Sequence, residues 1–85
     1  MTTSERFADA QQRVKVLQAA PDTDKLLELY ALYKQGTAGD ATGARPGMMD
    51  FKGRAKFDAW AKQKGSSQEA AMVAYVTLVD ALAKA

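Results

Sequence analysis

The chain has 85 residues, of which 47% are hydrophobic and 26% are charged, and its formal net charge is +2. This length suits a single domain, residues 1–85, and the composition is that of an ordinary globular protein. Because the sequence contains neither cysteine nor histidine, it excludes disulfides, thiol nucleophiles, imidazole bases and Cys/His metal sites, and we predict no enzymatic activity, no metal and no cofactor.

No segment predicts export or a membrane span. The start, Met-Thr-Thr-Ser-Glu-Arg-Phe, lacks the apolar stretch of a signal peptide. No apolar run approaches the roughly 20 residues that cross a bilayer. We therefore expect a cytoplasmic protein without stable membrane insertion.

The first helix is predicted from about Thr3 to Leu17. Apolar residues recur there at three- and four-residue steps, which is the period of one helix face. This stripe consists of Phe7, Ala10, Val14 and Leu17. Pro21 ends the connection that follows, and Asp22 or Thr23 can cap the next helix.

The second helix is predicted to end at about Gln35, with Gly36 and Gly39 as its stop signals. It is apolar around much of its circumference, so we expect it to contact neighbours on more than one side. The connection over residues 36–50 is too long for a tight turn. Such a loop more often borders a functional site.

The third helix is predicted from about Phe51 to Lys62, and Gly65 closes it. Ser66, with Glu69 three residues later, matches a capping box for a fourth helix. That helix is expected to bury Ala71 or Met72, Tyr75, Val76, Val79 and Leu82. Since no alternating strand pattern occurs, we predict an all-α four-helix bundle.

Aromatic and cationic side chains gather on the second helix. Tyr30, Tyr33 and Lys34 project from one face, within an arc of roughly 100°. A tyrosine ring can stack on a nucleobase, and its hydroxyl can meet a phosphate. The same spacing also suits tyrosines that pack in the core and lysines that extend into solvent.

Residues 45–64 hold half of the twelve basic residues. Only Asp50 and Asp58 oppose them, which favours an anionic partner, although a solvated helix face has the same pattern. Lys52 and Lys56 are four residues apart and can converge on one anion. Five apolar residues are candidates for lining a groove, in part because methionine adapts to varied shapes: Leu26, Leu27, Met48, Met49 and Met72. A place in the core is the better reading for Met72.

Three long motifs carry a resemblance to a known family. They are Tyr30-x-x-Tyr33-Lys34-Gln35-x-Thr37-x-Gly39-Asp40, then Arg45-Pro46-Gly47-Met48-x-Asp50-Phe51-Lys52-Gly53-x-Ala55-Lys56-x-Asp58-Ala59-Trp60, and Gly65-x-Ser67-x-Glu69-x-Ala71-Met72-x-Ala74-Tyr75. With these motifs the chain resembles the acyl-CoA-binding protein family, the small carriers of long-chain fatty acyl-CoA esters. The similarity runs without gaps from Phe7 through Leu82.

The resemblance implies an up-down-down-up four-helix bundle with a bowl-shaped site. It implies a monomer that binds, buffers and transports medium- to long-chain fatty acyl-CoA esters inside the cell. The adenine and the 3′-phosphoribose would be held by Tyr30, Tyr33, Lys34, Lys56 and Tyr75. Lys15 and Lys52 match further ligand-contacting positions, and Leu27 with its neighbours would meet the pantetheine and the acyl chain. The first and last helices would pack through Phe7, Val14, Leu17, Tyr75, Val76, Val79 and Leu82.

Three positions depart from the family pattern. Phe57 stands where a second tryptophan is usual, Gln11 replaces a small alanine near the ligand, and Ala20 replaces a basic residue before Pro21. These departures bear on affinity and on the preferred chain length, not on the class of protein.

Two other functions are compatible with parts of the pattern. One is a helical protein-interaction module that uses Leu26, Leu29 and Leu32 and has no small-molecule ligand. The other is weak binding of single-stranded nucleic acid by the tyrosine and lysine face. The net charge of +2 argues against nucleic acid, because neutralising its backbone needs a longer basic track.

Overall fold

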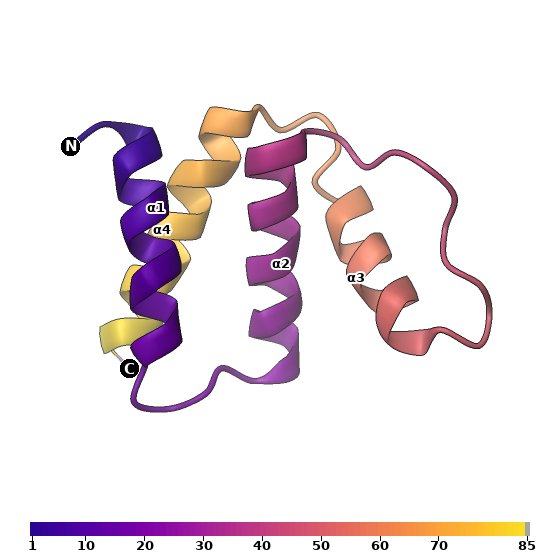
Figure 1. Ribbon diagram of the computed structural model, residues 1–85, viewed down its shortest axis with the longest axis horizontal. Helices are drawn as coiled ribbons and strands as arrows, with labels where there is room; N and C mark the ends of the chain where they lie inside the picture. The colour runs from indigo at the N-terminus through magenta and orange to yellow at the C-terminus, as the bar shows by residue number, and fades with distance from the viewer. Residues whose placement is uncertain (85) are drawn as a thin grey trace.

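The structure is a computed structural model that describes residues 1–84, in which four α-helices and one short 3-10 helix occur (Figure 1). The elements are α1 (Thr3–Arg13), η1 (Val14–Val16), α2 (Thr23–Ala38), α3 (Phe51–Ala61) and α4 (Gln68–Lys84). Within residues 1–84 there is no strand, so the predicted all-α fold is confirmed. None of the helices in this range combines the length and apolarity that a membrane crossing requires.

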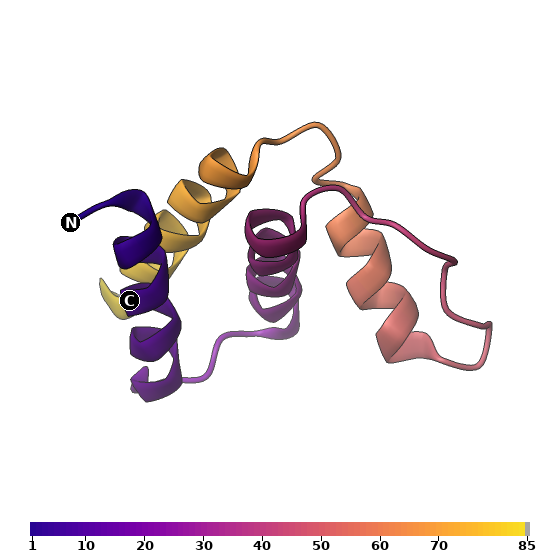
Figure 2. The same cartoon turned by 45° about the horizontal axis from the view of Figure 1, so that its top comes forward.

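The helix α2 stands at the centre of the molecule. It packs against α4 and α3, and α1 packs against α4. Figures 1 and 2 show α1 and α4 on one side of α2 and α3 on the other. The helices α2 and α3 run parallel to each other and opposite to α1 and α4. This is the predicted up-down-down-up order.

The hydrophobic core lies where α1, α2 and α4 meet. It consists of Phe7, Ala10, Leu29, Leu32, Tyr75 and Val79. The rings of Phe7 and Tyr75 meet edge to face, with their centroids 5.1 Å apart. Val14, Val76 and Leu82 pack against this cluster, as predicted. Leu17 does not belong to it, because the regular helix ends at Arg13 and the chain turns away through η1.

Side-chain caps begin the helices. At α1, the Thr2 hydroxyl accepts a hydrogen bond from the Glu5 amide and the Glu5 carboxylate accepts one from the Thr2 amide, a capping box. At α2, the Asp22 carboxylate accepts from the Lys25 amide at 2.9 Å, so the cap predicted at Asp22 or Thr23 is Asp22.

The predicted end of α2 at about Gln35 is too early. Of its two predicted stop signals, Gly39 is confirmed and Gly36 is wrong. The helix continues to Ala38, and Gly39, at a φ of 81°, ends it. Gly36 is buried inside the helix, where a Cβ atom would lie only 3.2 Å from Met72 Cγ and 3.3 Å from Phe7 Cζ. The glycine therefore serves close packing of α2 against its neighbours.

The predicted capping box of α4 at Ser66 and Glu69 is also wrong. The cap is Ser67, whose Oγ accepts a hydrogen bond from the Ala70 amide at 3.0 Å. Ser66 lies in the preceding turn, and its carbonyl oxygen accepts a hydrogen bond from the Gln35 side chain. This contact between distant parts of the chain moves the helix start by one residue.

The long connection between α2 and α3 is fixed at its α2 end. The amide of the fully buried Gln35 donates to the Asp40 carboxylate at 2.7 Å and to the Ser66 carbonyl at 2.8 Å. The Trp60 indole donates to the Gly39 carbonyl at 2.8 Å. These bonds join the ends of α2 and α3 to the start of α4.

The same connection is also fixed near α3. The Arg45 guanidinium donates two hydrogen bonds to the Asp58 carboxylate, at 2.9 and 2.7 Å. The Arg54 side chain donates to the Pro46 carbonyl at 2.9 Å. Two of the basic residues in this segment thus hold the loop against α3.

Candidate functional site

A first hollow, which we call the tyrosine hollow, lies beside α2 on the side of η1 and α4. Its volume is about 400 Å³. It is lined by Val14, Lys15, Pro21, Leu26, Leu29, Tyr30, Tyr33 and Tyr75. All three tyrosines of the chain therefore meet at one place, together with one lysine.

A second hollow, which we call the lysine hollow, lies between α2 and α3. Its volume is about 250 Å³, and most of its surface is apolar. It is lined by Thr23, Leu26, Leu27, Tyr30, Lys52, Ala55 and Lys56. Lys52 and Lys56 do converge at this hollow, as their spacing predicts.

The two hollows adjoin because Leu26 and Tyr30 line both of them. These residues and Tyr33 follow one another at four- and three-residue steps, so they form one stripe of α2. The surfaces of both hollows are mostly apolar, and the stripe joins the one that holds the three tyrosines and Lys15 to the one that holds Lys52 and Lys56. Such a surface suits a ligand that carries a flat ring and anionic groups at one end and an apolar chain at the other.

Two lysines lie over aromatic rings. The Lys56 ammonium is 5.5 Å from the centroid of the Tyr30 ring, and the Lys34 ammonium is 4.8 Å from that of Trp60. Both distances are within the range of a cation–π contact. Lys34 therefore points toward α3 and, alone among the predicted site residues, lines neither hollow.

Tyr75 belongs to the core and also lines the tyrosine hollow. Only 5% of its surface is exposed, yet it lines the tyrosine hollow. Burial raises the pKa of Tyr75, and the nearby Tyr33 adds to this shift. Among residues 1–84 the Tyr75 hydroxyl has no hydrogen-bond partner, so at neutral pH it can donate to a ligand.

Pro21 and Ala55 line the hollows but were not predicted to do so, whereas Leu26 was predicted to line an apolar groove. Leu26 is 51% exposed, and its position one turn before Tyr30 is consistent with that prediction. Pro21 and Ala55 carry no comparable signal, because only helix packing brings them there.

Other expectations about the site are corrected. Met48 and Met49 line neither hollow and are 75% and 87% exposed, since they lie in a turn outside the bundle. The Gln11 amide donates to the Phe7 carbonyl on its own helix at 3.4 Å and also lines neither hollow.

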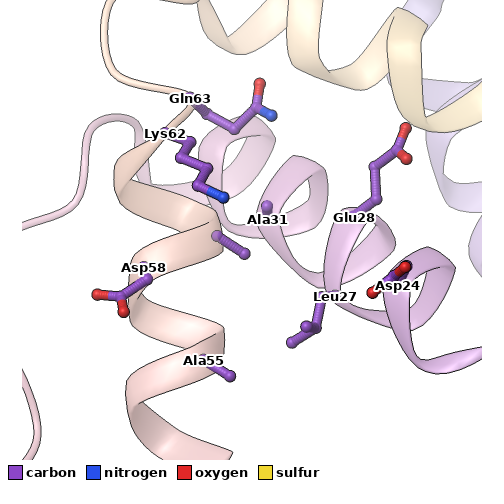
Figure 3. A pocket seen from close by; sticks show the side chains of 9 residues that line it. Asp24, Leu27, Glu28, Ala31, Ala55, Asp58, Lys62 and Gln63 are labelled. Carbon is purple, nitrogen blue, oxygen red and sulfur yellow. The ribbon is translucent and has the colours of Figure 1, made fainter.

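A third hollow lies across the α2–α3 contact from the lysine hollow (Figure 3). Its volume is about 510 Å³, and Leu27 and Ala55 line both it and the lysine hollow. The other residues around it are Asp24, Glu28, Ala31, Asp58, Ala59, Lys62 and Gln63. Three carboxylates against one ammonium disfavour a phosphate there, so the tyrosine and lysine hollows are the better candidates for an anionic ligand.

Known proteins share this sequence and fold. Residues 4–79 match the family model described as "Acyl CoA binding protein". A Drosophila melanogaster protein named "Acyl-CoA-binding protein homolog" is 51% identical over 79 residues, which are 93% of this chain and 92% of that protein. A Caenorhabditis elegans protein, "Acyl-CoA-binding protein homolog 1", is 53% identical over 76 residues, covering 89% and 88% of the two chains.

A solved structure agrees with these relatives. The crystal structure of Oryza sativa acyl-CoA-binding protein 2 superimposes with a TM-score of 0.92 at 39% identity, over 96% of this chain and 89% of the rice chain. The family model, the relatives and the bundle thus concur along nearly the whole sequence. The chain therefore belongs to the acyl-CoA-binding protein family.

Proposed function

We propose that this protein binds medium- to long-chain fatty acyl-CoA esters one to one, as a cytoplasmic monomer, and thereby buffers and transports them. The observation that carries the proposal is the junction of the tyrosine and lysine hollows at Leu26 and Tyr30. Membership of the family and the names of its relatives support the same ligand.

The head group of the ligand would lie over the tyrosines and lysines. Stacking of a base on an aromatic ring contributes about 1–3 kcal/mol. Each charge-assisted contact with a phosphate contributes about 1.5–3 kcal/mol. Tyr30, Tyr33 and Tyr75 offer the rings and hydroxyls, and the Lys56 ammonium lies over the Tyr30 ring. Lys34 would join them by the family resemblance, although its ammonium lies over the Trp60 ring and it lines neither hollow. Lys15 in the tyrosine hollow and Lys52 in the lysine hollow would add further contacts with the ligand.

The acyl chain would follow the apolar wall of the lysine hollow, formed by Leu26, Leu27 and Ala55. Each buried methylene contributes roughly 0.8 kcal/mol. The hollow is shallow and open, so the polar head must fold over part of the chain to shield it from water. A long chain then supplies much of the affinity, while the head group sets the orientation.

The proposed role contains no chemical step. The sequence has no histidine or cysteine that could activate a nucleophile or accept a proton near neutral pH. Ser67 is occupied as the cap of α4. The protein would hold its ligand and release it unchanged.

A protein-interaction module is the second candidate, but most of the surface that it would use is buried. Leu29 and Leu32 are each only 6% exposed, because they belong to the core between α2 and α4. Leu26 alone remains accessible, and one leucine offers too little area for a stable interface.

Calorimetric titration with palmitoyl-CoA, free CoA and a short single-stranded oligonucleotide tests the proposal. We expect one palmitoyl-CoA per chain, weaker binding of free CoA and no heat from the oligonucleotide. Equal affinity for palmitoyl-CoA and free CoA would remove the acyl part of the proposal, and no binding of either would reject it.

A further inference from the structure

A pair of methionines forms the tip of the turn that leads into α3. Met48 and Met49 occupy its two central positions, and the turn is closed by a hydrogen bond from the Asp50 amide to the Gly47 carbonyl, 3.0 Å long. Turn tips normally carry glycine, proline, asparagine, aspartate or serine. Here the two methionines are 75% and 87% exposed, and Phe51, which follows them, is 74% exposed. We call these three residues the apolar tip.

The apolar tip is held in place from both sides. Before it, the Pro46 carbonyl accepts a hydrogen bond from the Arg54 side chain at 2.9 Å. After it, the Asp50 carboxylate accepts one from the Gly53 amide at 2.9 Å. A side chain at Gly53 would collide with that carboxylate, so glycine permits this tight cap. The apolar side chains thus project from a braced turn.

Positive charge adjoins the apolar tip. Between residues 45 and 57 the chain has four basic residues and only one acidic residue, Asp50. Arg45 is paired with Asp58, but within residues 1–84 neither Lys52 nor Lys56 forms an ion pair. Exposed apolar side chains beside available ammonium groups are the combination that binds a bilayer with anionic head groups.

The shape of this region favours a membrane over a protein partner. Figures 1 and 2 show the connection and the start of α3 at the edge of the molecule farthest from α1 and α4. The apolar tip is therefore a protrusion, whereas partner helices bind in grooves. Three side chains are also far fewer than the roughly 20–30 residues that each side of a stable protein interface contributes, which argues against a second copy of the chain.

We propose that the apolar tip docks this protein on the surface of an anionic phospholipid bilayer. Met48, Met49 and Phe51 enter the interfacial layer, and Lys52 and Lys56 meet the lipid phosphates. The docking is peripheral and involves no membrane-spanning segment. The apolar tip itself lines neither hollow, but the docking shares Lys52 and Lys56 with the lysine hollow. It therefore brings that hollow to the bilayer.

Co-sedimentation of the ligand-free full chain with lipid vesicles tests this proposal. We expect binding to vesicles of equal parts phosphatidylserine and phosphatidylcholine, weaker binding to phosphatidylcholine alone, and loss of binding at high salt. The double variant Met48→Ser/Met49→Ser should lower the association constant about tenfold, because burying even one methionine side chain is worth about that factor. Val16→Ser is the matched control, since Val16 is 77% exposed on η1, and it should bind as the wild type does.

A second measurement locates the contact. Tryptophan placed by Met49→Trp should be quenched by brominated lipid, whereas tryptophan placed by Val16→Trp should not. Circular dichroism and palmitoyl-CoA titration of the double variant establish that its fold and ligand site are intact. Vesicle binding that is absent in the wild type, or unchanged in the double variant, overturns the proposal. So does a dimer in analytical centrifugation that the double variant abolishes, because the apolar tip would then bind a second copy.

Discussion

Aromatic rings hold two of the lysines that are proposed to bind the ligand. The ammonium groups of Lys34 and Lys56 lie 4.8 and 5.5 Å from the rings of Trp60 and Tyr30. A ring attracts an ammonium group without neutralising it, so the charge stays available to a phosphate. The Trp60 ring is itself fixed by its hydrogen bond to the Gly39 carbonyl. Phe57, whose ring is 6.3 Å from that of Trp60, keeps an aromatic neighbour there without an indole N–H.

Lys56→Ala should weaken acyl-CoA binding by about 1.5–3 kcal/mol, because one charge-assisted contact with the 3′-phosphate is lost. The loss should be much smaller with 3′-dephospho-acyl-CoA, measured by calorimetry. Lys62→Ala is the control, since Lys62 lines the third hollow instead, and this variant should bind acyl-CoA with wild-type affinity. Equal losses of Lys56→Ala for both esters would show that Lys56 does not meet the 3′-phosphate.

Tyr75→Phe should cost about 0.5–1.5 kcal/mol of acyl-CoA binding, which is the net value of one hydrogen bond. Stability should hardly change, because within residues 1–84 the hydroxyl has no partner to lose. Tyr75→Ala should instead lower the free energy of unfolding by about 3–5 kcal/mol, since it empties the core beside Phe7. Urea unfolding and calorimetry separate the two effects. Wild-type affinity in Tyr75→Phe would assign this residue to the core alone.

Among the elements, α2 does most to organise the molecule. One of its faces supplies Leu29 and Leu32 to the core, and another supplies Leu26 and Tyr30 to both hollows. Gly36, near its end, lets Met72 of α4 and Phe7 of α1 approach closely. The register of α2 against these helices therefore also sets the shape of the tyrosine hollow.

Gly36→Val should destabilise the fold by about 1–3 kcal/mol. The added atoms have no room beside Met72 and Phe7, and overpacking of this kind costs about that much. Thr37→Val is the matched control, because it places the same residue at the next, exposed position of α2. Thermal and urea unfolding measure both variants. If Gly36→Val is no less stable than Thr37→Val, the close approach of the helices at Gly36 is not a constraint.

The ion pair between Arg45 and Asp58 makes the stability of the fold depend on pH in the acidic range. The hydrogen bonds from the Arg45 guanidinium lower the pKa of Asp58 below its ordinary value of 3.8. The folded protein then binds fewer protons at this site than the unfolded chain does. The stabilisation is therefore fully present above pH 3.8 and is lost as the pH falls through the lower folded pKa.

Asp58→Asn should therefore flatten the decline of stability below about pH 4, because the titrating group is gone. Urea midpoints measured between neutral and acidic pH show the slope. Arg45→Gln should flatten it similarly, since it removes the cause of the lowered pKa. If both variants keep the wild-type slope of stability against pH, the Arg45–Asp58 pair does not cause the loss of stability in acid.

The whole molecule is flat, with extents of 38 × 28 × 15 Å. The helix α2 is covered by α4 on one side and by α3 on the other, and a stripe of it remains open between them. That opening contains both hollows. A thicker bundle that enclosed α2 on all sides would leave no surface long enough for an extended ligand.

Affinity for acyl-CoA should rise with chain length over the medium range. The increments should stay below about 0.8 kcal/mol per methylene, because an open hollow buries each methylene only partly. Calorimetry with esters from acetyl to palmitoyl gives the series. Equal affinity along the whole series would mean that the apolar wall at Leu26 and Leu27 does not bind the chain.

The sequence by itself determined the features that depend on neighbours along the chain. Helical periodicity identified the four helices, the cap of the second was narrowed to Asp22 or Thr23, and the tyrosine spacing placed Tyr30 and Tyr33 on one face. The family motifs predicted the up-down-down-up order and seven residues that line the two hollows: Lys15, Leu27, Tyr30, Tyr33, Lys52, Lys56 and Tyr75. The helices and the shared face of the tyrosines rest on i, i+3 and i+4 contacts, which the order of residues dictates, whereas the helix order and the lining residues came from the family resemblance.

Only the tertiary structure decided what depends on contacts between helices. Glycine is a common stop signal for a helix, yet Gly36 is buried within α2 because α1 and α4 approach there. Ser67 caps α4 in place of Ser66 because Gln35 binds the Ser66 carbonyl. Leu26 joins two hollows, and Met49 projects from a braced turn. The crossing and register of the helices set these contacts, and no pattern along one helix encodes either.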